Sequence, residues 1–318
     1  MRRRKASSCP ARALDVPREY QERQIGRRTF LGGVSRIAAG ALTAGASLEL
    51  MAPRQAWARQ IATHPASARL VDRLRTQFTF QISVDVATIE QGLAVAGAAL
   101  AGGITLVEMG TPLLKNQGVS NVVPAFRRKF PDALLLADMK TMDGGAFEAR
   151  AVYTGGGNIV DFLALAGVDT AKAICGVRDE FRRENPDLPR LVFTDIMVPH
   201  QGPAAQAVEV ARRMLDAGVD AVGIHLQADA RRANPALMET HLLEDVARAI
   251  FDRVGSAAPV QVVGGLTVAQ AKSLAKAGLR AFVISGNLGQ PDSRARYDLP
   301  PDQIQRLVAE FVTGVSGA

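Results

Sequence analysis

From residue 78 onward the chain repeats one pattern, in which a short β-rich run is followed by a polar or glycine-rich turn and an amphipathic stretch. The pattern occurs eight times before the chain ends at residue 318. Alternating strands and helices predict a parallel sheet, and eight consecutive units predict a closed barrel. We therefore expect an α/β chain whose residues 78–318 form a (β/α)₈ TIM barrel.

The expected strands are the eight β-rich runs Thr79–Asp85, Ile104–Met109, Ala133–Asp138, Asn158–Leu165, Arg190–Met197, Ala221–His225, Val260–Val263 and Ala281–Ile284. The expected helices are Thr88–Ala101, Ser120–Phe130, Gly144–Thr154, Asp169–Glu184, Pro203–Ala217, Glu239–Val254, Thr267–Ala277 and Pro301–Val315. An open, doubly wound sheet is disfavoured because no GxGxxG motif follows the first strand. Residues 59–77 are expected to form a linker and a short helix beneath the barrel.

The charge of the chain is concentrated at its start. Residues 1–58 carry eleven Lys or Arg and four Asp or Glu, whereas the remaining residues hold 27 of each sign. A nucleic-acid-binding protein needs a basic surface on its folded body, and this body is neutral. We therefore expect no nucleic-acid partner.

The basic segment has the organisation of an export signal. Arg27-Arg28-Thr29-Phe30-Leu31 follows a basic region and opens a mildly apolar stretch, Leu31 to Met51, and Ala56-Trp57-Ala58 offers a cleavage site. This resembles a twin-arginine signal peptide, which exports folded proteins, and it predicts a periplasmic location. The alternative is a disordered segment or a surface-lying basic helix on a cytoplasmic protein. No later segment is apolar enough to span a membrane, so we expect no membrane contact once the signal is removed.

The two cysteines predict no internal disulfide in the body of the protein. Cys9 lies in the basic segment, and Cys175 lies in a helix-like stretch without a CxxC partner. We interpret Cys175 as a packing residue.

Acidic and basic residues gather where the expected strands end. Asp138 and Lys140 alternate at the end of the third strand, so their side chains would share a face, and Asp143 follows. Catalytic groups of such barrels come from the carboxyl ends of different strands. Other strands end in or near Asp85, Glu108 and His225, and the fifth strand contributes Asp195. Taken singly each could be structural, but seven such residues at one rim favour an active site.

These residue types suit a particular chemistry. Glu108 and Asp138 offer carboxylate oxygens to a hard cation such as Mg²⁺, which can hold an enediolate between two sugar oxygens. Lys140 can add positive charge beside the same oxygens. His225 can move a proton near neutral pH.

Glycine turns follow the last two strands. Gly264-Gly265 comes after the seventh strand, and Gly286-Asn287 comes after the eighth. Turns at these two places commonly bind phosphate in barrels of this kind. We expect Gly264, Gly265, Gly286 and Asn287, together with Asp195, to contact the substrate or its phosphate.

At this point the sequence resembles the orotidine 5′-phosphate decarboxylase superfamily over residues 78–290. The superfamily shares the D-x-K-x-x-D motif, here Asp138 to Asp143. Glu108-Met-Gly-Thr-Pro followed by Lys115-Asn116-Gln117-Gly118 is similar to the branch of 3-hexulose-6-phosphate synthase and 3-keto-L-gulonate-6-phosphate decarboxylase.

The resemblance implies a homodimeric barrel with shared sites. It implies Mg²⁺ on Glu108 and Asp138, contacts from Asp85 and Lys140 to substrate and intermediate, and proton transfer by His225. It also implies that Asp143 reaches the site of the partner subunit. The intermediate would be a metal-bound enediolate, which the synthase adds to formaldehyde and the decarboxylase protonates after CO₂ is lost.

Two departures from the family pattern bear on the substrate. The decarboxylases carry an arginine three residues after the histidine, where this chain has Ala228, which favours the aldolase. Many relatives carry a phosphate-binding arginine after strand eight, where this chain has Asn287; Arg294 and Arg296 are candidate replacements.

We therefore expect a Mg²⁺-dependent carbon–carbon lyase that resembles 3-hexulose-6-phosphate synthase and condenses formaldehyde with ribulose 5-phosphate. The alternatives are a decarboxylase of a 3-keto sugar acid phosphate, or an exported barrel that acts on a different, unphosphorylated sugar or binds one without turnover.

Overall fold

The computed structural model describes residues 64–318, apart from residue 239 and residues 292–293. The expected export signal at residues 1–58 lies outside the described residues. Among the helices of the described part, none is long and apolar enough to cross a membrane.

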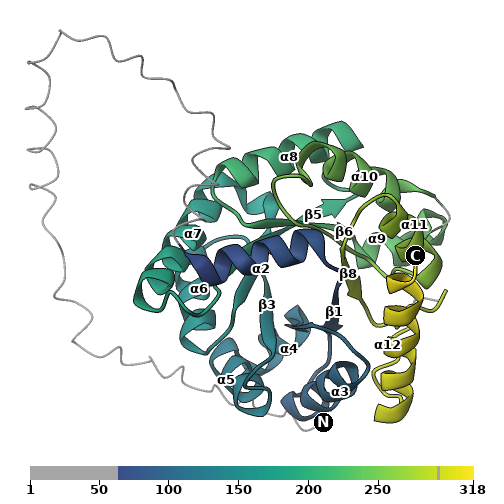
Figure 1. The fold of residues 1–318 in the computed structure, drawn as a ribbon, viewed down its shortest axis with the longest axis horizontal. Coiled ribbons are helices and arrows are strands. Elements are labelled where there is room, and N and C mark those ends of the chain that lie inside the picture. Colours follow the sequence, from purple (N-terminus) through teal and green to yellow (C-terminus); the bar gives the residue numbers. More distant parts are fainter. Residues whose placement is uncertain (1–63, 239, 292–293) are drawn as a thin grey trace, which may run out of the picture. The chain divides into compact units, whose positions relative to one another are not determined.

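The expected barrel is confirmed. Eight parallel strands close on themselves in sequence order, and β1 pairs with both β2 and β8 (Figure 1). The strands are β1 Thr79–Val84, β2 Leu106–Met109, β3 Leu134–Thr141, β4 Ile159–Leu163, β5 Leu191–Val198, β6 Ala221–Leu226, β7 Val260–Val263 and β8 Ala281–Ile284. All eight coincide with expected strands, with ends that differ by up to three residues.

The helices surround the barrel, and each expected helix is present. They are α3 Ile89–Ala101, α5 Val119–Lys129, α6 Gly145–Thr154, α7 Gly167–Glu184, α8 Ala204–Asp216, α10 Leu242–Val254, α11 Val268–Lys276 and α12 Pro301–Ser316. Short helices that the sequence pattern did not predict are α4 Thr111–Gln117, α9 Ala228–Ala233 and the 3₁₀ turns η2 Ala164–Ala166 and η3 Pro235–Met238. The segments α4 and α9 follow β2 and β6, so both lie at the rim where the strands end.

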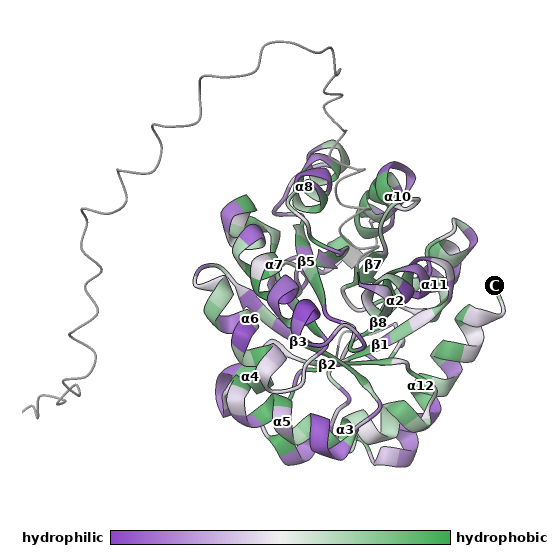
Figure 2. Cartoon of the chain, turned by 60° about the vertical axis from the view of Figure 1, so that its left-hand side comes forward, coloured by the Kyte–Doolittle hydropathy of each residue, from purple (hydrophilic) through white to green (hydrophobic). Residues whose placement is uncertain are grey.

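Burial explains this arrangement. The strands are mostly hydrophobic, whereas the surrounding helices carry both apolar and polar residues (Figure 2). One large apolar cluster joins the strands to the inner faces of the helices. Burial of apolar surface of this kind is the dominant favourable contribution to folding.

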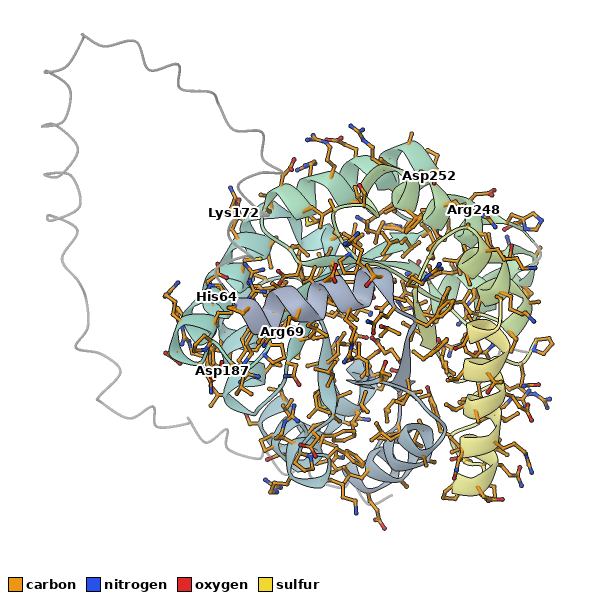
Figure 3. All side chains as sticks on the ribbon, in the orientation of Figure 1. His64, Arg69, Lys172, Asp187, Arg248 and Asp252 are labelled. Carbon is orange, nitrogen blue, oxygen red and sulfur yellow. The ribbon has the colours of Figure 1, made fainter. Side chains whose placement is uncertain are left out.

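The floor of the barrel is closed by α2, Pro65–Thr76, which crosses the amino-terminal ends of the strands (Figure 1). Leu70, Val71 and Leu74 pack there against residues that begin the strands, such as Leu106 and Leu191. This is the short helix expected within residues 59–77. His64, which precedes α2, lies at this side of the molecule (Figure 3).

A buried ion-pair network fastens α7 to the barrel. Asp220 is fully buried and accepts hydrogen bonds from Arg178 Nη1 at 2.8 Å and from Arg182 Nη2 at 3.0 Å. It also accepts from the backbone N–H of Val192 at 2.8 Å. Cys175, on the same helix, is buried in the core as expected, and burial raises the pKa of its thiol to about 12.

Candidate active site

A cavity of about 530 Å³ opens at the carboxyl ends of the strands. Its lining contains ten of the eleven residues predicted from the sequence, namely Asp85, Glu108, Asp138, Lys140, Asp195, His225, Gly264, Gly265, Gly286 and Asn287. The structure therefore brings together groups that are up to about 200 residues apart in the sequence, as a closed barrel requires.

Lys140 lies at the centre of the acidic side of this cavity. Its Nζ donates to both carboxylate oxygens of Asp138 at 2.8 Å and to Asp195 Oδ2 at 2.6 Å. Burial disfavours the ammonium, but the surrounding carboxylates, Asp138 first, outweigh it and raise the pKa of Lys140 well above its usual range. Lys140 is therefore held as a cation.

The end of β3 is shaped to place this pair. The strand continues past Asp138 to Thr141, with an irregular register opposite β4 between these two residues. Lys140 has a positive φ of 48°, which is uncommon for a residue with a side chain. The sequence predicted that Asp138 and Lys140 would share a face, and the ion pair confirms that they meet. The two side chains do not meet through regular strand alternation, because the strand is irregular between Asp138 and Thr141 and Lys140 has a positive φ.

Asp195 links Lys140 to the histidine. His225 Nδ1 lies 3.1 Å from Asp195 Oδ2, the same oxygen that accepts from Lys140. Burial alone would raise the pKa of Asp195, but Lys140 and His225 outweigh it and hold the pKa well below its usual range. Asp195 is thus an ionised acceptor, so it favours a proton on the Nδ1 of His225.

A series of side-chain hydrogen bonds orients Glu108. Gln261 donates to Gln81 Oε1 at 2.8 Å, Gln81 donates in turn to Glu108 Oε2, and the Ser83 hydroxyl lies 2.9 Å from Glu108 Oε1. The same hydroxyl is 2.7 Å from Asp85 Oδ2.

Close packing of the β1 and β2 ends seats Asp85 beside this chain. A Cβ on Gly110 would lie 2.2 Å from Asp85 Oδ1, so the glycine of the Glu-x-Gly-Thr-Pro segment is needed for this approach. Burial, then the charges of Asp138 and Asp85, raise the pKa of Glu108 well above its usual range.

These carboxylates fit a divalent cation. Glu108 and Asp138 face one cavity. Asp138 Oδ2 already accepts from Lys140 and Thr111, whereas Asp138 Oδ1 accepts from Lys140 and keeps a further lone pair. A cation there would offset the like charges that raise the pKa of Glu108. The most tightly grouped carboxylates are a different set, Asp138, Asp161 and Asp195, whose ligand atoms lie within 4.8 Å of one another. In that set the Lys140 ammonium already bridges Asp138 and Asp195. A cation that shared Asp138 would find its second carboxylate in Glu108.

Sequence reasoning missed Asp161, which is a central residue of β4. It is buried and lines the cavity, and its Oδ1 has no hydrogen-bond partner among the described residues. Burial, then the charges of Asp195 and Asp138, raise the pKa of Asp161 well above its usual range. The available signal was one carboxylate inside the otherwise apolar run Ile159–Leu163.

The glycine turns form the opposite end of the cavity. Gly265 has a φ of 75° and lies beside Ser285, whose Oγ accepts from the Gly265 N–H at 3.4 Å. Asn287 lines the cavity but directs its Nδ2 to the carbonyl of Gly265, at 2.9 Å, and to the carbonyl of Gln290, at 2.7 Å. Its amide thus fastens the two turns to each other.

Asp143 is the one predicted residue outside the cavity lining. It is exposed, and its Oδ1 accepts from the N–H of Gly144 at 2.7 Å. Arg294 and Arg296 also lie outside the lining, whereas Arg231 and Arg232 of α9 are part of it. Further lining residues that sequence reasoning missed are Gln81, Ser83, Gln261 and Tyr297, whose hydroxyl donates to the Ser83 carbonyl.

Comparison with known proteins agrees with the geometry. Residues 79–290 match the model of the orotidine 5′-phosphate decarboxylase / HUMPS family. The chain is 32% identical over 206 residues to a 3-hexulose-6-phosphate synthase of Mycobacterium gastri, a match that covers 65% of this chain and 89% of that protein.

Solved structures share the fold. A crystal structure of 3-hexulose-6-phosphate synthase superposes with a TM-score of 0.59 at 24% identity and covers 73% of this chain and 99% of its own. A crystal structure of KGPDC from Streptococcus mutans gives 0.58 at 22%, with 74% and 97% covered. Because the family match spans the whole barrel up to the turn after β8, the chain belongs to the orotidine 5′-phosphate decarboxylase / HUMPS family.

Proposed function

We propose that this protein is a carbon–carbon lyase of the 3-hexulose-6-phosphate synthase type, which condenses formaldehyde with ribulose 5-phosphate to give a hexulose 6-phosphate. The observation that carries the proposal is Lys140, held as a cation between Asp138 and Asp195, with His225 on the same Asp195 oxygen. The 32% identity to a synthase matched over 89% of its length supports the same reaction.

His225 and Lys140 have different roles in this reaction. A proton must leave C1 of the ketose before C1 can form a bond to the formaldehyde carbon, and the formaldehyde oxygen must then take up a proton. His225, whose Nδ1 faces Asp195, would accept the first proton at Nε2 and return the second. Lys140 remains charged, so it acts by stabilising negative charge on the sugar oxygens rather than as a base.

We also propose Mg²⁺ as the cofactor, held by Glu108 and Asp138. When bound, it would supply Lewis-acid stabilisation of negative charge on the sugar oxygens. Gln81, Ser83 and Gln261 would keep the Glu108 carboxylate in place for this role, since outer hydrogen bonds orient metal ligands.

The test is formaldehyde consumption with ribulose 5-phosphate and Mg²⁺, with EDTA as the metal control. We expect EDTA-sensitive consumption that falls about 10²- to 10⁴-fold in His225→Asn, the range for loss of a general acid–base group. The matched control is His241→Asn, because His241 is exposed and lies outside the cavity lining. A folded wild-type protein that consumes no formaldehyde would refute the proposal, and CO₂ release from a 3-keto sugar acid phosphate would establish the decarboxylase instead.

We further propose that the protein is a homodimer. Asp143 is exposed next to the apolar side chains of Met142, 53% exposed, and Phe147, 82% exposed. Contiguous exposed apolar surface marks interaction sites, and a second copy packed on this segment would bring Asp143 toward the cavity of that copy. Light scattering should give twice the chain mass, and Phe147→Asp should give the monomer; a monomeric wild type would contradict the proposal.

Finally, we propose export through the twin-arginine route, on the basis of Arg27-Arg28 and the apolar stretch that follows. Cell fractionation should find the wild type in the periplasm and the Arg27→Lys, Arg28→Lys double variant in the cytoplasm. Equal distribution of the two would count against export.

A further inference from the structure

Asp161 brings a carboxyl group into the cavity that the protein itself leaves without a partner. It is the middle residue of β4, its side chain lines the cavity, and it is only 5% exposed. Its Oδ1 is buried and has no hydrogen-bond partner among the described residues. Burial of a carboxyl group without a partner is unfavourable, so such a group in a cavity points to a partner that arrives with a ligand.

Lys140 does not serve as this partner. Its ammonium has three N–H donors. Its three hydrogen bonds go to the two carboxylate oxygens of Asp138, at 2.8 Å each, and to Asp195 Oδ2, at 2.6 Å. Oxygens of Asp138, Asp161 and Asp195 lie within 4.8 Å of one another. Asp161 is therefore a close neighbour of both ion pairs without being a member of either.

Apolar residues lie below Asp161. Ile159, two residues earlier on the same face of β4, belongs to the apolar cluster at the floor of the barrel. Phe193, which is the register partner of Asp161 on β5, belongs to the same cluster. Asp161 thus lies where the apolar floor ends, and the cavity is the side from which a partner can approach.

The charge around Asp161 decides which chemical group can be that partner. An anion would be repelled by the carboxylates of Asp138 and Asp195 beside it. A hydroxyl group is neutral, and it can donate to a carboxylate or accept from a carboxylic acid. It can therefore bond to Asp161 in either protonation state, and hydroxyl groups are what a sugar offers.

We propose that Asp161 is a specificity residue that binds the hydroxyl group on C3 of the ketose. Under the proposed function Lys140 and His225 act at C1 and C2, and both contact Asp195. Asp161 has an oxygen within 4.8 Å of an oxygen of Asp195, so the next carbon along the chain presents its hydroxyl to Asp161. The inference rests on the proposed function for the identity of the sugar.

Two sugars that differ only in the configuration at C3 test the inference by binding. Isothermal titration of the full chain, with Mg²⁺ and without formaldehyde, compares ribulose 5-phosphate with its C3 epimer, xylulose 5-phosphate. We expect the wild type to bind ribulose 5-phosphate about 10- to 100-fold more tightly, the range for one hydrogen bond to a charged group. Asp161→Val cannot form this bond and should bind the two epimers almost equally. Asp161→Asn should keep part of the preference, because its amide still bonds to a hydroxyl.

The stability of the same variants separates this role from a structural one. The buried oxygen of Asp161 has no hydrogen bond to lose among the described residues, and it lies beside two like charges. Asp161→Val should therefore raise the midpoint of thermal unfolding of the ligand-free protein. The matched control is Asp252→Asn, since Asp252 is exposed on α10 and lies outside the cavity lining (Figure 3). It should change neither the epimer preference nor the midpoint.

Four results would overturn the inference. They are a wild type that does not prefer ribulose 5-phosphate, a preference that survives in Asp161→Val, a lower unfolding midpoint in Asp161→Val, and loss of Mg²⁺ binding by that variant in a titration with the metal alone. The last result would make Asp161 a metal ligand. A wild type that distinguishes the epimers through Asp161 but consumes no formaldehyde would refute the proposed reaction and uphold the inference.

Discussion

Replacement of Lys140 by Met should destabilise the protein in a way that depends on pH. The ammonium is the cation for Asp138 and Asp195, whose side chains are only 8% and 4% exposed. Removal of one partner from a buried ion pair typically costs about 3–5 kcal/mol, because the remaining charge is left uncompensated. Met is similar in length, so the loss of charge dominates over the loss of volume.

The sign of the pH effect follows from the pKa shifts. In the wild type the pKa of Asp195 is lowered, so its contribution to stability is present above the unfolded value of about 3.9 and is lost as pH falls below it. Without Lys140, burial would raise the pKa of Asp195 instead, as it does for Asp161. The folded variant would then bind a proton that the unfolded chain releases. The loss of unfolding free energy caused by the substitution would therefore grow as pH rises.

Urea unfolding at pH 5 and pH 8 measures this pH dependence of stability directly. EDTA is present so that no metal replaces the ammonium. We expect the loss of unfolding free energy to approach about 3–5 kcal/mol at pH 8 and to be clearly smaller at pH 5. Lys172→Met is the matched control, since Lys172 is exposed on α7 (Figure 3). A loss that does not change with pH, or that is no larger than in the control, would refute the reasoning.

Three further predictions concern other parts of the molecule. Asp195→Asn should lower kcat for formaldehyde consumption about 10²- to 10⁴-fold with little change in KM, because the amide no longer fixes the histidine tautomer; steady-state kinetics that show only a KM effect would contradict this. Asp220→Asn should cost about 3–5 kcal/mol in urea unfolding, because two buried arginines lose their shared carboxylate, and a loss below about 1 kcal/mol would show that the network is not stabilising. In a Cys9→Ser protein, Cys175 should react with a thiol reagent at pH 8 only on unfolding, because burial raises its thiol pKa to about 12; rapid reaction of the native protein would disprove the assigned packing role.

The fold was predictable from the sequence because each strand and helix carries its own local pattern. The strand β7 and the helix α12, for example, begin at the expected residues. The short segments α4 and α9 were not predicted, since a helix of six or seven residues has too few turns to show a period. Their positions depend instead on contacts made after the barrel closes.

Most predicted site residues lie at or next to a strand end, as Asp85 and His225 do. Asp195 lies inside β5 and was nevertheless predicted, whereas Asp161 inside β4 was missed. The sequence did not show that Arg231 lines the cavity. Its position over Gly265 depends on how α9 packs above the turn after β7. The hydrogen bond between Gln81 and Gln261 could not be predicted from the sequence. A glutamine in a strand has no distinctive pattern until its partner across the barrel is known.

The closure of the floor by α2 has a practical consequence for the use of this protein. His64 and α2 lie at the amino-terminal ends of the strands, and the cavity opens at the carboxyl ends. In a shortened chain that begins at His64, a bead or fusion partner joined to that residue would therefore attach on the side away from the mouth. Immobilisation through that end should leave small aldehydes and sugars free to diffuse in, so a tethered preparation should keep the KM of the free one.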